Sequence, residues 1–419
     1  MPPVPANVLS ARYMTRFRCL ASDCEATCCG GGAVPVEPST HRRLTLLAES
    51  DPAARALLEQ GVELTPGGPD FARLRFLASG DCSMLDSAGL CRIHSKFGHG
   101  ALFDVCATYP RYVNEIDGEV ELFGTLSCPE ISRLALLSDD GFEQESIELD
   151  ALPRKLRNRF GTEQPYFQPY AAVRTALLRL LAEPDFKLAE KLFVLLWLAD
   201  QLRPILHAGC RAVPAGDLQA VLGALAGPGV LPRLAATFRG LDIDGQLPLA
   251  VTWHALPPAA ELRRGAQTER FDAIVRDVWA TYDRRPGPSA EASAEQLSEL
   301  WLHYVSQRAA IPGKVRDRVD VCLTRYAKNH VHTTPYMLSS SLFAYAYDLV
   351  VRLAILRFLL QTRLSGFDGS PAELDGQIVE VTYAFVRAVE HTDLLGRVQT
   401  LLDAQGLNGL PHALCFLSV

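Results

Sequence analysis

Cysteines are concentrated near the N-terminus of this chain. Eight of its eleven cysteines lie within the first 128 residues: Cys19, Cys24, Cys28, Cys29, Cys82, Cys91, Cys106 and Cys128. Thiolates are soft ligands that select zinc, copper(I) and iron–sulfur clusters over hard cations. In a reducing compartment, such clustering indicates metal or redox chemistry rather than disulfide bonds. We therefore predict that these eight cysteines supply the ligands of a metal centre.

The first four cysteines have the spacing Cys19-x4-Cys24-x3-Cys28-Cys29. Short spacings let one loop wrap a metal with little loss of chain entropy. The glycines at 30–32 permit unusual backbone dihedral angles close to a cluster. Adjacent cysteines cannot easily point at one iron, so we expect Cys28 and Cys29 to have different functions.

The identity of the metal is left open by the cysteines alone. A site with four cysteines holds either a tetrahedral zinc ion or a cubane iron–sulfur cluster. Eight thiols are more than one site requires. Either some of them are buried neighbours that do not bind metal, or a second site exists. The pattern favours a 4Fe-4S cluster and keeps structural zinc as the alternative. The isolated Cys210, Cys322 and Cys415 are expected to act as small hydrophobic residues.

The elements that position the cysteines are short, whereas those that follow are long. Asp51-Pro52 is typical of a helix start, the alternation at 71–77 predicts a strand, and 82–94 resembles a hairpin. Asp117-Gly118 separates two alternating runs at 112–123, which predicts a hairpin with a type I′ turn.

Beyond about residue 129, apolar residues recur at three- and four-residue spacing, which is typical of helices. Helices are predicted at 170–182, 186–206 (capped by Asp185), 217–225, 258–282, 290–309, 314–328, 336–364 and 371–390. The predicted fold class is mainly α. It has a small α+β cysteine-rich metal-binding domain at 1–137 and a helical domain at 138–419, with a further division open near 284–290.

Charge and hydropathy narrow the range of partners. The net charge is −7, whereas a general affinity for nucleic acid or anionic membranes needs a basic surface. The N-terminus lacks the pattern of a signal peptide. The apolar run at 192–198 is too short to span a bilayer, and that at 349–360 carries Arg352 and Arg357. We expect a cytoplasmic protein with no nucleic-acid partner and no membrane insertion.

Four motifs within residues 13–137 resemble the flagellin lysine-N-methylase family and, more distantly, zinc- or iron-chelating cysteine-cluster domains. They are Phe17-x-Cys19-x4-Cys24-x3-Cys28-Cys29, Leu90-Cys91-x-Ile93-His94-x3-Gly98, Cys106-x2-Tyr109-Pro110-Arg111 and Ser127-Cys128-Pro129-Glu130-x2-Arg133-Leu134. Tyr326-x2-Asn329 and the apolar helix after it extend the resemblance loosely into the C-terminal part.

The resemblance implies methylation of flagellin lysines, with S-adenosylmethionine (SAM) as methyl donor and an iron–sulfur cluster in the enzyme. It also implies radical-like cleavage of SAM, which requires a reductant. Three cysteines would hold a four-iron cluster and leave one iron open to SAM. The radical motif C-x3-C-x2-C is absent, because Cys24-x3-Cys28-Cys29 shares only its first spacing. The set of ligands is therefore open.

Three residues near the cysteines are candidates for binding SAM or the substrate. Arg111 can pair with the SAM carboxylate or form a salt bridge with Glu130. Tyr109 would line the pocket, and Glu130 could accept the cationic lysine. The lysine is expected to enter between the cysteine-rich and helical domains. Two other functions are open: a noncatalytic zinc- or iron–sulfur-binding module, and an electron-transfer protein.

Overall fold

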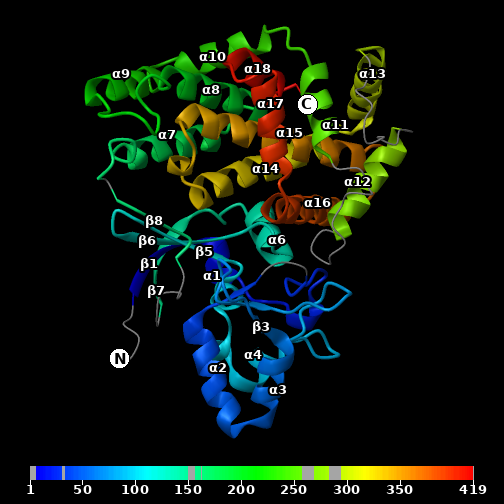
Figure 1. Cartoon of the computed structure of the whole chain (residues 1–419). Coiled ribbons are helices and arrows are strands. Elements are labelled where there is room, and N and C mark those ends of the chain that lie inside the picture. The colour runs from blue at the N-terminus through cyan, green and yellow to red at the C-terminus, as the bar shows by residue number, and fades with distance from the viewer. Residues whose placement is uncertain are drawn as a thin grey trace.

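The chain is predominantly helical and carries an α+β region near its N-terminus, as the sequence predicts. The computed structural model describes residues 6–30, 34–149, 156–161, 163–256, 269–282 and 294–418. Figure 1 shows a body of helices at the top, a sheet beneath it and a small lobe at the bottom.

The N-terminal part alternates short strands and short helices. Its strands are β1 (Ala6–Ala11), β2 (Pro35–Val36), β3 (Val62–Leu64), β4 (Ala72–Leu74), β5 (Arg111–Ile116), β6 (Glu119–Gly124), β7 (Gln144–Leu149) and β8 (Asn158–Phe160). Its α-helices are α1 (Arg12–Arg16), α2 (Pro38–Ser50), α3 (Pro52–Gly61), α4 (Arg92–Phe97), α5 (Asp104–Thr108) and α6 (Pro129–Leu137).

A five-stranded sheet with the order β7-β1-β6-β5-β8 lies against the helical body. Strands β5 and β6 form the predicted hairpin, in which Tyr112 pairs with Phe123. Both turn residues have positive φ, 54° at Asp117 and 83° at Gly118, as a type I′ turn requires. Strand β1 runs parallel to β6 and antiparallel to β7.

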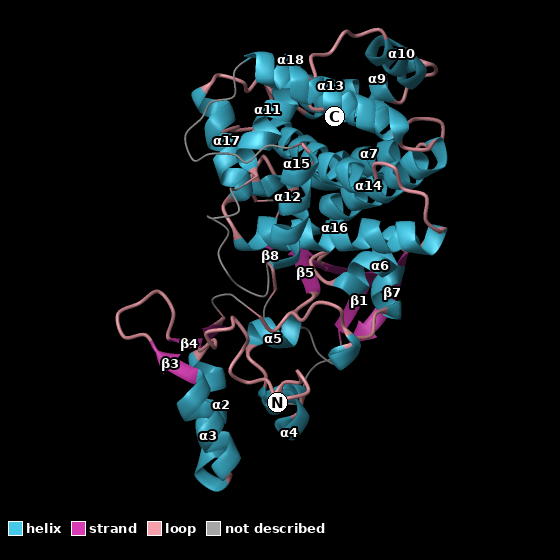
Figure 2. Ribbon diagram, turned by 90° about the vertical axis from the view of Figure 1, so that its right-hand side faces the viewer, coloured by secondary structure: helices cyan, strands magenta, loops and turns pink. Residues whose placement is uncertain are grey.

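The chain between β1 and β5 forms most of the lobe, which we define as residues 34–107. It contains the small sheet β2-β4-β3 and a hydrophobic cluster of its own, separate from the main core. Asp51 caps α3 as predicted, because its carboxylate accepts hydrogen bonds from the backbone N–H groups of Ala53 and Ala54. Figure 2 shows α5 on the side of the lobe that faces the helical body.

The helical body follows β8. Its helices are α7 (Tyr170–Ala182), α8 (Leu188–Gln201), α9 (Ala215–Leu225), α10 (Val230–Arg239), α11 (Gln246–Ala255), α12 (Glu269–Thr281), α13 (Ala294–Ala310), α14 (Gly313–Thr333), α15 (Leu342–Arg363), α16 (Pro371–His391), α17 (Leu394–Ala404) and α18 (Leu410–Cys415). Helix α14 packs on β6, and both α14 and α16 pack on α6. The main core therefore joins the five-stranded sheet to the helices.

Several element predictions need correction. Strands β7 and β8 lie where only helices were expected. Strand β7 was missed because four of its six side chains are polar and none of the six is fully buried. The segment 82–94 forms one bridge, Leu85 to Cys91, before α4 begins, rather than a full hairpin. Helix α8 starts after Lys187, so Asp185 is not its cap.

Some predictions lie outside the described residues, and the domain boundary is not tested. The helix expected at 258–268, the division at 284–290 and the glycines at 31–32 fall in segments that the structure does not describe. The division into 1–137 and 138–419 stays a prediction, because a shared core does not show which part folds alone.

No single helix in the described ranges is long and apolar enough to cross a membrane; α9 and α10 pass that test only as a pair, bent by 73°.

A buried hydrogen-bonded brace ties the N-terminal segment to α14. The Tyr13 hydroxyl donates to the Asn329 side-chain oxygen at 2.7 Å and accepts from the Gly124 N–H at 2.8 Å. The Asn329 amide donates to the Gly124 carbonyl at 3.2 Å. Three segments far apart in the sequence are thereby joined inside the core.

We predict that Tyr13→Phe destabilises the chain, because it leaves two buried polar groups without their partner. The expected loss is about 1–3 kcal/mol in the free energy of unfolding, measured by urea titration. Tyr347→Phe is the matched control, since it removes one partly buried bond to the Leu407 carbonyl. A loss for Tyr13→Phe no larger than that of the control would contradict the importance of the brace.

Candidate functional site

The eight N-terminal cysteines lie in the lobe and at its junction with the five-stranded sheet. None forms a disulfide bond. Their exposure varies: Cys19 and Cys28 are exposed, Cys24, Cys29, Cys91 and Cys106 are half-buried, and Cys82 and Cys128 are buried. The site is therefore reachable from solvent on one side and packed on the other.

Backbone pairing brings the first cysteine segment to the second. The Cys82 N–H donates to the Cys29 carbonyl at 2.9 Å, beside the bridge between Gly30 and Asp81. A tight turn stabilised by the Asp86 carboxylate then reverses the chain direction and brings Cys91 back towards Cys82. Cysteines more than fifty residues apart in the sequence thus share one small region, as the sequence predicts.

Cys28 and its neighbours lie close enough to affect one another's ionisation. A hydrogen bond with the Cys29 side chain, followed by burial, raises the pKa of the Cys28 thiol. Burial raises the pKa of Cys128 to about 12, and the nearby Cys24 and Cys28 add to the shift. The thiols of Cys28 and Cys128 are therefore protonated at neutral pH in the chain without metal.

A second group of thiols adjoins the first through Cys28. Burial raises the pKa of Cys106, and Cys82, Cys91 and Cys28 add to that effect. Burial also raises the pKa of Cys82, with a contribution from Cys91. A metal would have to displace these protons, so its affinity should rise with pH.

The thiols of this site suit a soft metal. Which of them are metal ligands stays a prediction. Seven of the eight thiols interact with at least one other thiol. Within the described ranges, however, no three His, Cys, Asp or Glu side chains are placed to share one ion. The choice between zinc and iron–sulfur likewise stays open.

Cys19 differs from the other cysteines because its charged neighbour is Arg111. The Arg111 guanidinium lies over the Phe17 ring, 5.6 Å from its centroid. Burial lowers the pKa of Arg111, while Cys19 opposes that shift. Among the described residues, this guanidinium has no hydrogen-bond or ion-pair partner, which leaves its donors available to an anionic group.

Glu130 is paired with Arg133 rather than with Arg111, so the alternative of an Arg111–Glu130 salt bridge is wrong. Glu130 and Arg133 are one helical turn apart on α6 and lie on the same side of it. Arg133 also contacts the Glu25 carboxylate at 2.5 Å. The ion pairs thus fasten the loop between Cys24 and Cys28 to α6.

Tyr109 lies between the thiols and a chain of hydroxyl groups. Its hydroxyl is 3.3 Å from the Ser127 hydroxyl, which in turn is 2.9 Å from that of Thr125. Burial and the nearby Cys128 raise the pKa of Tyr109 well above its usual value. Thr125 donates to Glu390 of α16 at 2.7 Å, so the chain of hydroxyls ends on the helical body.

Sequence reasoning missed the arginines that hold the Cys24–Cys28 loop. Arg387 of α16 donates to the carbonyls of Ala26 and Thr27, and Arg270 of α12 donates to the Glu25 carbonyl at 3.3 Å. The available signal was an arginine inside the apolar run Ala384-Phe385-Val386-Arg387-Ala388-Val389. A charged residue in such a run must find buried acceptors.

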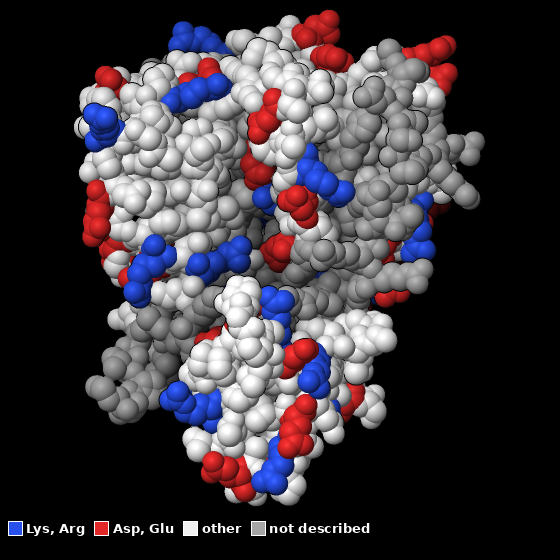
Figure 3. Space-filling model, in the orientation of Figure 1, with Lys and Arg blue, Asp and Glu red and all other residues white. Residues whose placement is uncertain are grey.

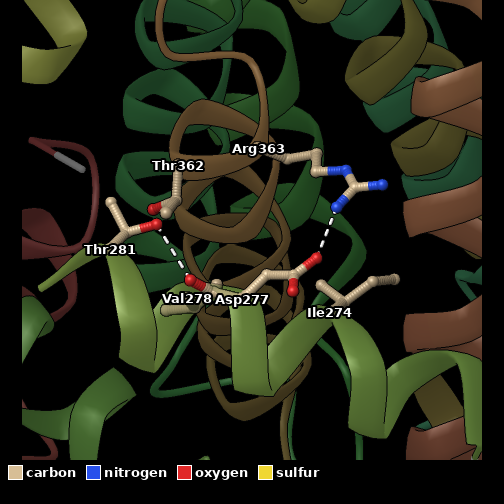
Figure 4. Close-up of a pocket in the computed structure, with 6 residues that line it drawn as sticks. All are labelled: Ile274, Asp277, Val278, Thr281, Thr362 and Arg363. Carbon is tan, nitrogen blue, oxygen red and sulfur yellow. Dashed lines mark hydrogen bonds and ion pairs between the residues drawn. The ribbon is translucent and has the colours of Figure 1, made fainter. Parts of the chain in front are cut away.

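Two cavities lie away from the cysteines. One, of about 190 Å³, lies between α12 and the end of α15, where Arg363 pairs with Asp277 (Figure 4). The other, of about 350 Å³, adjoins the β5–β6 turn and is lined by Glu119, Glu121 and Arg174 among others. Basic and acidic side chains are interspersed over the face in Figure 3, without a patch of one sign.

Comparison with protein families gives a match over the helical body. A family model described as "FliB lysine N-methylase C-terminal domain" matches residues 174–416, more than half of the chain. The match runs from within α7 to the end of α18, so it includes Arg387 and leaves the eight cysteines outside.

Individual proteins from Salmonella are also similar. The flagellar biosynthetic protein FliU of Salmonella muenchen is 26% identical over 158 residues, which cover 36% of this chain and 92% of that protein. Lysine-N-methylases of Salmonella typhimurium and Salmonella choleraesuis are each 28% identical over 136 residues, which cover 32% of this chain. The chain thus spans 33% of the length of each of these two enzymes. No solved structure shows a significant match.

We predict that mild oxidation of the metal-free chain joins its N-terminal thiols to one another, because they lie close together. Disulfide mapping by mass spectrometry should link peptides from 19–29 with those containing Cys82, Cys91, Cys106 or Cys128. Cys210, Cys322 and Cys415 are the internal controls and should stay reduced. Links to these three, formed as readily as those among the N-terminal thiols, would contradict the geometry of the site.

Proposed function

The chain belongs to the FliB lysine N-methylase family, and from this premise we propose that it transfers methyl groups from SAM to lysine side chains of flagellin. The family match over the helical body is the observation that carries the proposal, and it agrees with the resemblance of the N-terminal motifs. The names of the relatives, lysine-N-methylase and flagellar biosynthetic protein, support the reaction and a flagellar substrate.

A cysteine-ligated iron–sulfur cluster is part of this proposal. Seven of the eight thiols lie near at least one other thiol, which supports it, because thiolates are the usual ligands of such clusters. When bound, the cluster supplies an electron for cleaving a carbon–sulfur bond of SAM, and an external reductant replaces that electron. The ligands come from Cys19, Cys24, Cys28, Cys29, Cys82, Cys91, Cys106 and Cys128.

Arg111 binds the carboxylate of SAM in this proposal. Its half-buried guanidinium has hydrogen-bond donors that no described residue accepts from, and it lies near the exposed Cys19. Tyr109 lines the same region from the buried side, next to Cys128. Glu130, two residues after Cys128, shares the Arg133 guanidinium with Glu25, so these three side chains together keep one negative charge that would attract a cationic lysine.

The route of the methyl group decides the by-product. A neutral lysine amine can take the methyl group directly from the sulfonium, which leaves S-adenosylhomocysteine and releases one proton. Reductive cleavage of the bond between the sulfur and the 5′-carbon of SAM would instead give methionine, which keeps its methyl group, and a 5′-deoxyadenosyl radical that becomes 5′-deoxyadenosine by taking a hydrogen atom. The methyl group would then come from a second SAM, which leaves as S-adenosylhomocysteine, so 5′-deoxyadenosine forms on this route only. Quantifying both products therefore distinguishes the two routes without any assumption about the ligands of the cluster.

We predict that Cys24→Ser and Cys28→Ser remove the visible absorption of the cluster and flagellin methylation together. Loss of a second-sphere partner of a metal already costs about 10- to 100-fold in affinity or activity, and loss of a direct ligand should cost at least as much. The chain is purified anaerobically, assayed for iron, sulfide and zinc, and incubated with reductant, SAM and flagellin. Methyl-lysine is measured by mass spectrometry.

Cys210→Ser is the control for these two variants and should keep both properties. Stoichiometric zinc without iron or sulfide would contradict the cluster. A native chain that holds its cluster but leaves flagellin unmethylated would contradict the methylase and favour a noncatalytic module or an electron-transfer protein.

A further inference from the structure

Arg387 is a buried cation at the boundary between the helical body and the cysteine loops. It lies near the end of α16, and only 2% of it is exposed. Its neighbours along the helix, Phe385 and Ala388, are fully buried. A guanidinium in such a place is costly unless hydrogen bonds and an opposite charge compensate it.

Its hydrogen bonds all go to backbone carbonyls of the segments that carry cysteines. The Nε–H donates to the Ser127 carbonyl at 2.7 Å, directly before Cys128. The two terminal nitrogens donate to the Thr27 and Ala26 carbonyls at 3.2 and 2.9 Å, between Cys24 and Cys28. One side chain therefore holds both cysteine segments in register.

The charge of Arg387 has no carboxylate partner among the described residues, unlike that of three other arginines that are buried or half-buried. Arg174 pairs with Glu121 at 2.7 Å, Arg357 with Asp320 at 2.8 Å and Arg352 with Asp348 at 2.5 Å. Each of these three has a carboxylate to balance it. Neutral carbonyls satisfy the donors of Arg387 but leave its net charge in place.

The groups near Arg387 that can become anionic are the thiols of Cys24 and Cys28 and the phenols of Tyr109 and Tyr383. Its hydrogen bonds to the Ala26, Thr27 and Ser127 carbonyls place it next to the segments that carry Cys24, Cys28 and Cys128. Its remaining close contact is the Tyr383 ring, 5.5 Å from the guanidinium carbon to the ring centroid. A centre made of several thiolates and a metal carries net negative charge. Such a charge would balance the positive charge of Arg387.

From these contacts we propose that Arg387 is a positioning residue that sets the Cys24–Cys28 and Ser127–Cys128 segments for metal binding and balances the negative charge of the thiolate–metal centre. The inference rests on the metal centre of the proposed function. It gives the helical body, where the family match lies, a direct part in forming that centre. Arg387 does not touch SAM or the lysine in this account.

The test is a cobalt titration of the metal-free chain, followed by the thiolate-to-cobalt charge-transfer absorption. Arg387→Gln removes the charge but keeps a hydrogen-bond donor, whereas Arg387→Lys keeps the charge with fewer donors. We expect cobalt affinity to fall in the order native, Arg387→Lys, Arg387→Gln. The loss for Arg387→Gln should be about 10-fold or more, as for other outer-sphere partners of metals.

Arg357→Gln is the matched control, since it neutralises a buried arginine of α15 that lies in a carboxylate pair. It should lower thermal stability and leave cobalt affinity unchanged. Equal affinities of Arg387→Gln and Arg387→Lys would overturn the role of the charge. If Arg387→Gln does not fold, Arg387→Lys decides, and an affinity equal to that of the native chain overturns the positioning role.

The cobalt titration uses neither SAM nor flagellin, so the two proposals can fail separately. The predicted order of affinities in a chain that does not methylate flagellin would support the role of Arg387 and contradict the methylase. Methylation by the native chain, together with an unchanged cobalt affinity in Arg387→Gln, would contradict the role of Arg387 alone.

Discussion

Three arginines from three helices hold the loop between Cys24 and Cys28, and the candidate site depends on that attachment. Apart from one short helical turn before Cys24, the segment has little regular structure, so its own backbone does not fix the directions of its thiols. Arg133 and Arg270 bind Glu25 at the surface, and Arg387 binds the next two carbonyls from within. A rigid outer frame thus positions an irregular inner loop, which is how metal sites gain a defined geometry.

The lobe and the helical body do not share one apolar core. The lobe has its own hydrophobic cluster, whereas the five-stranded sheet belongs to the main core. Hydrogen bonds among Tyr13, Gly124 and Asn329 join α1, β6 and α14. The cysteines at the ends of these segments, Cys19 and Cys128, are therefore placed by the sheet, while the cysteines of the lobe are placed by its turns.

Local patterns in the sequence predict what depends on local physics. The type I′ turn at Asp117-Gly118 and the Asp51 cap were predictable because a few adjacent residues determine them. Strand β7 was not, since its pairing with β1 comes from a segment more than a hundred residues away. Residue type predicts a thiol-ligated metal centre, and that centre stays a prediction, because no three ligands in the described ranges are placed to share one ion. The bonds from Arg387 to Ala26 span 361 residues, and no spacing rule reaches that far.

The family match and the cysteine motifs lie in different parts of the chain, yet the contacts make them interdependent. Residues 174–416 contain Arg387, Glu390 and Asn329, and each of these binds a group in the N-terminal part. Without the segments that carry Cys24, Cys28 and Cys128, the helical body would keep a buried cation with no thiols near it. Without α16, these segments would lose the Arg387 donors that hold them. We therefore expect the function of this family to require both parts of the chain and the contacts between them.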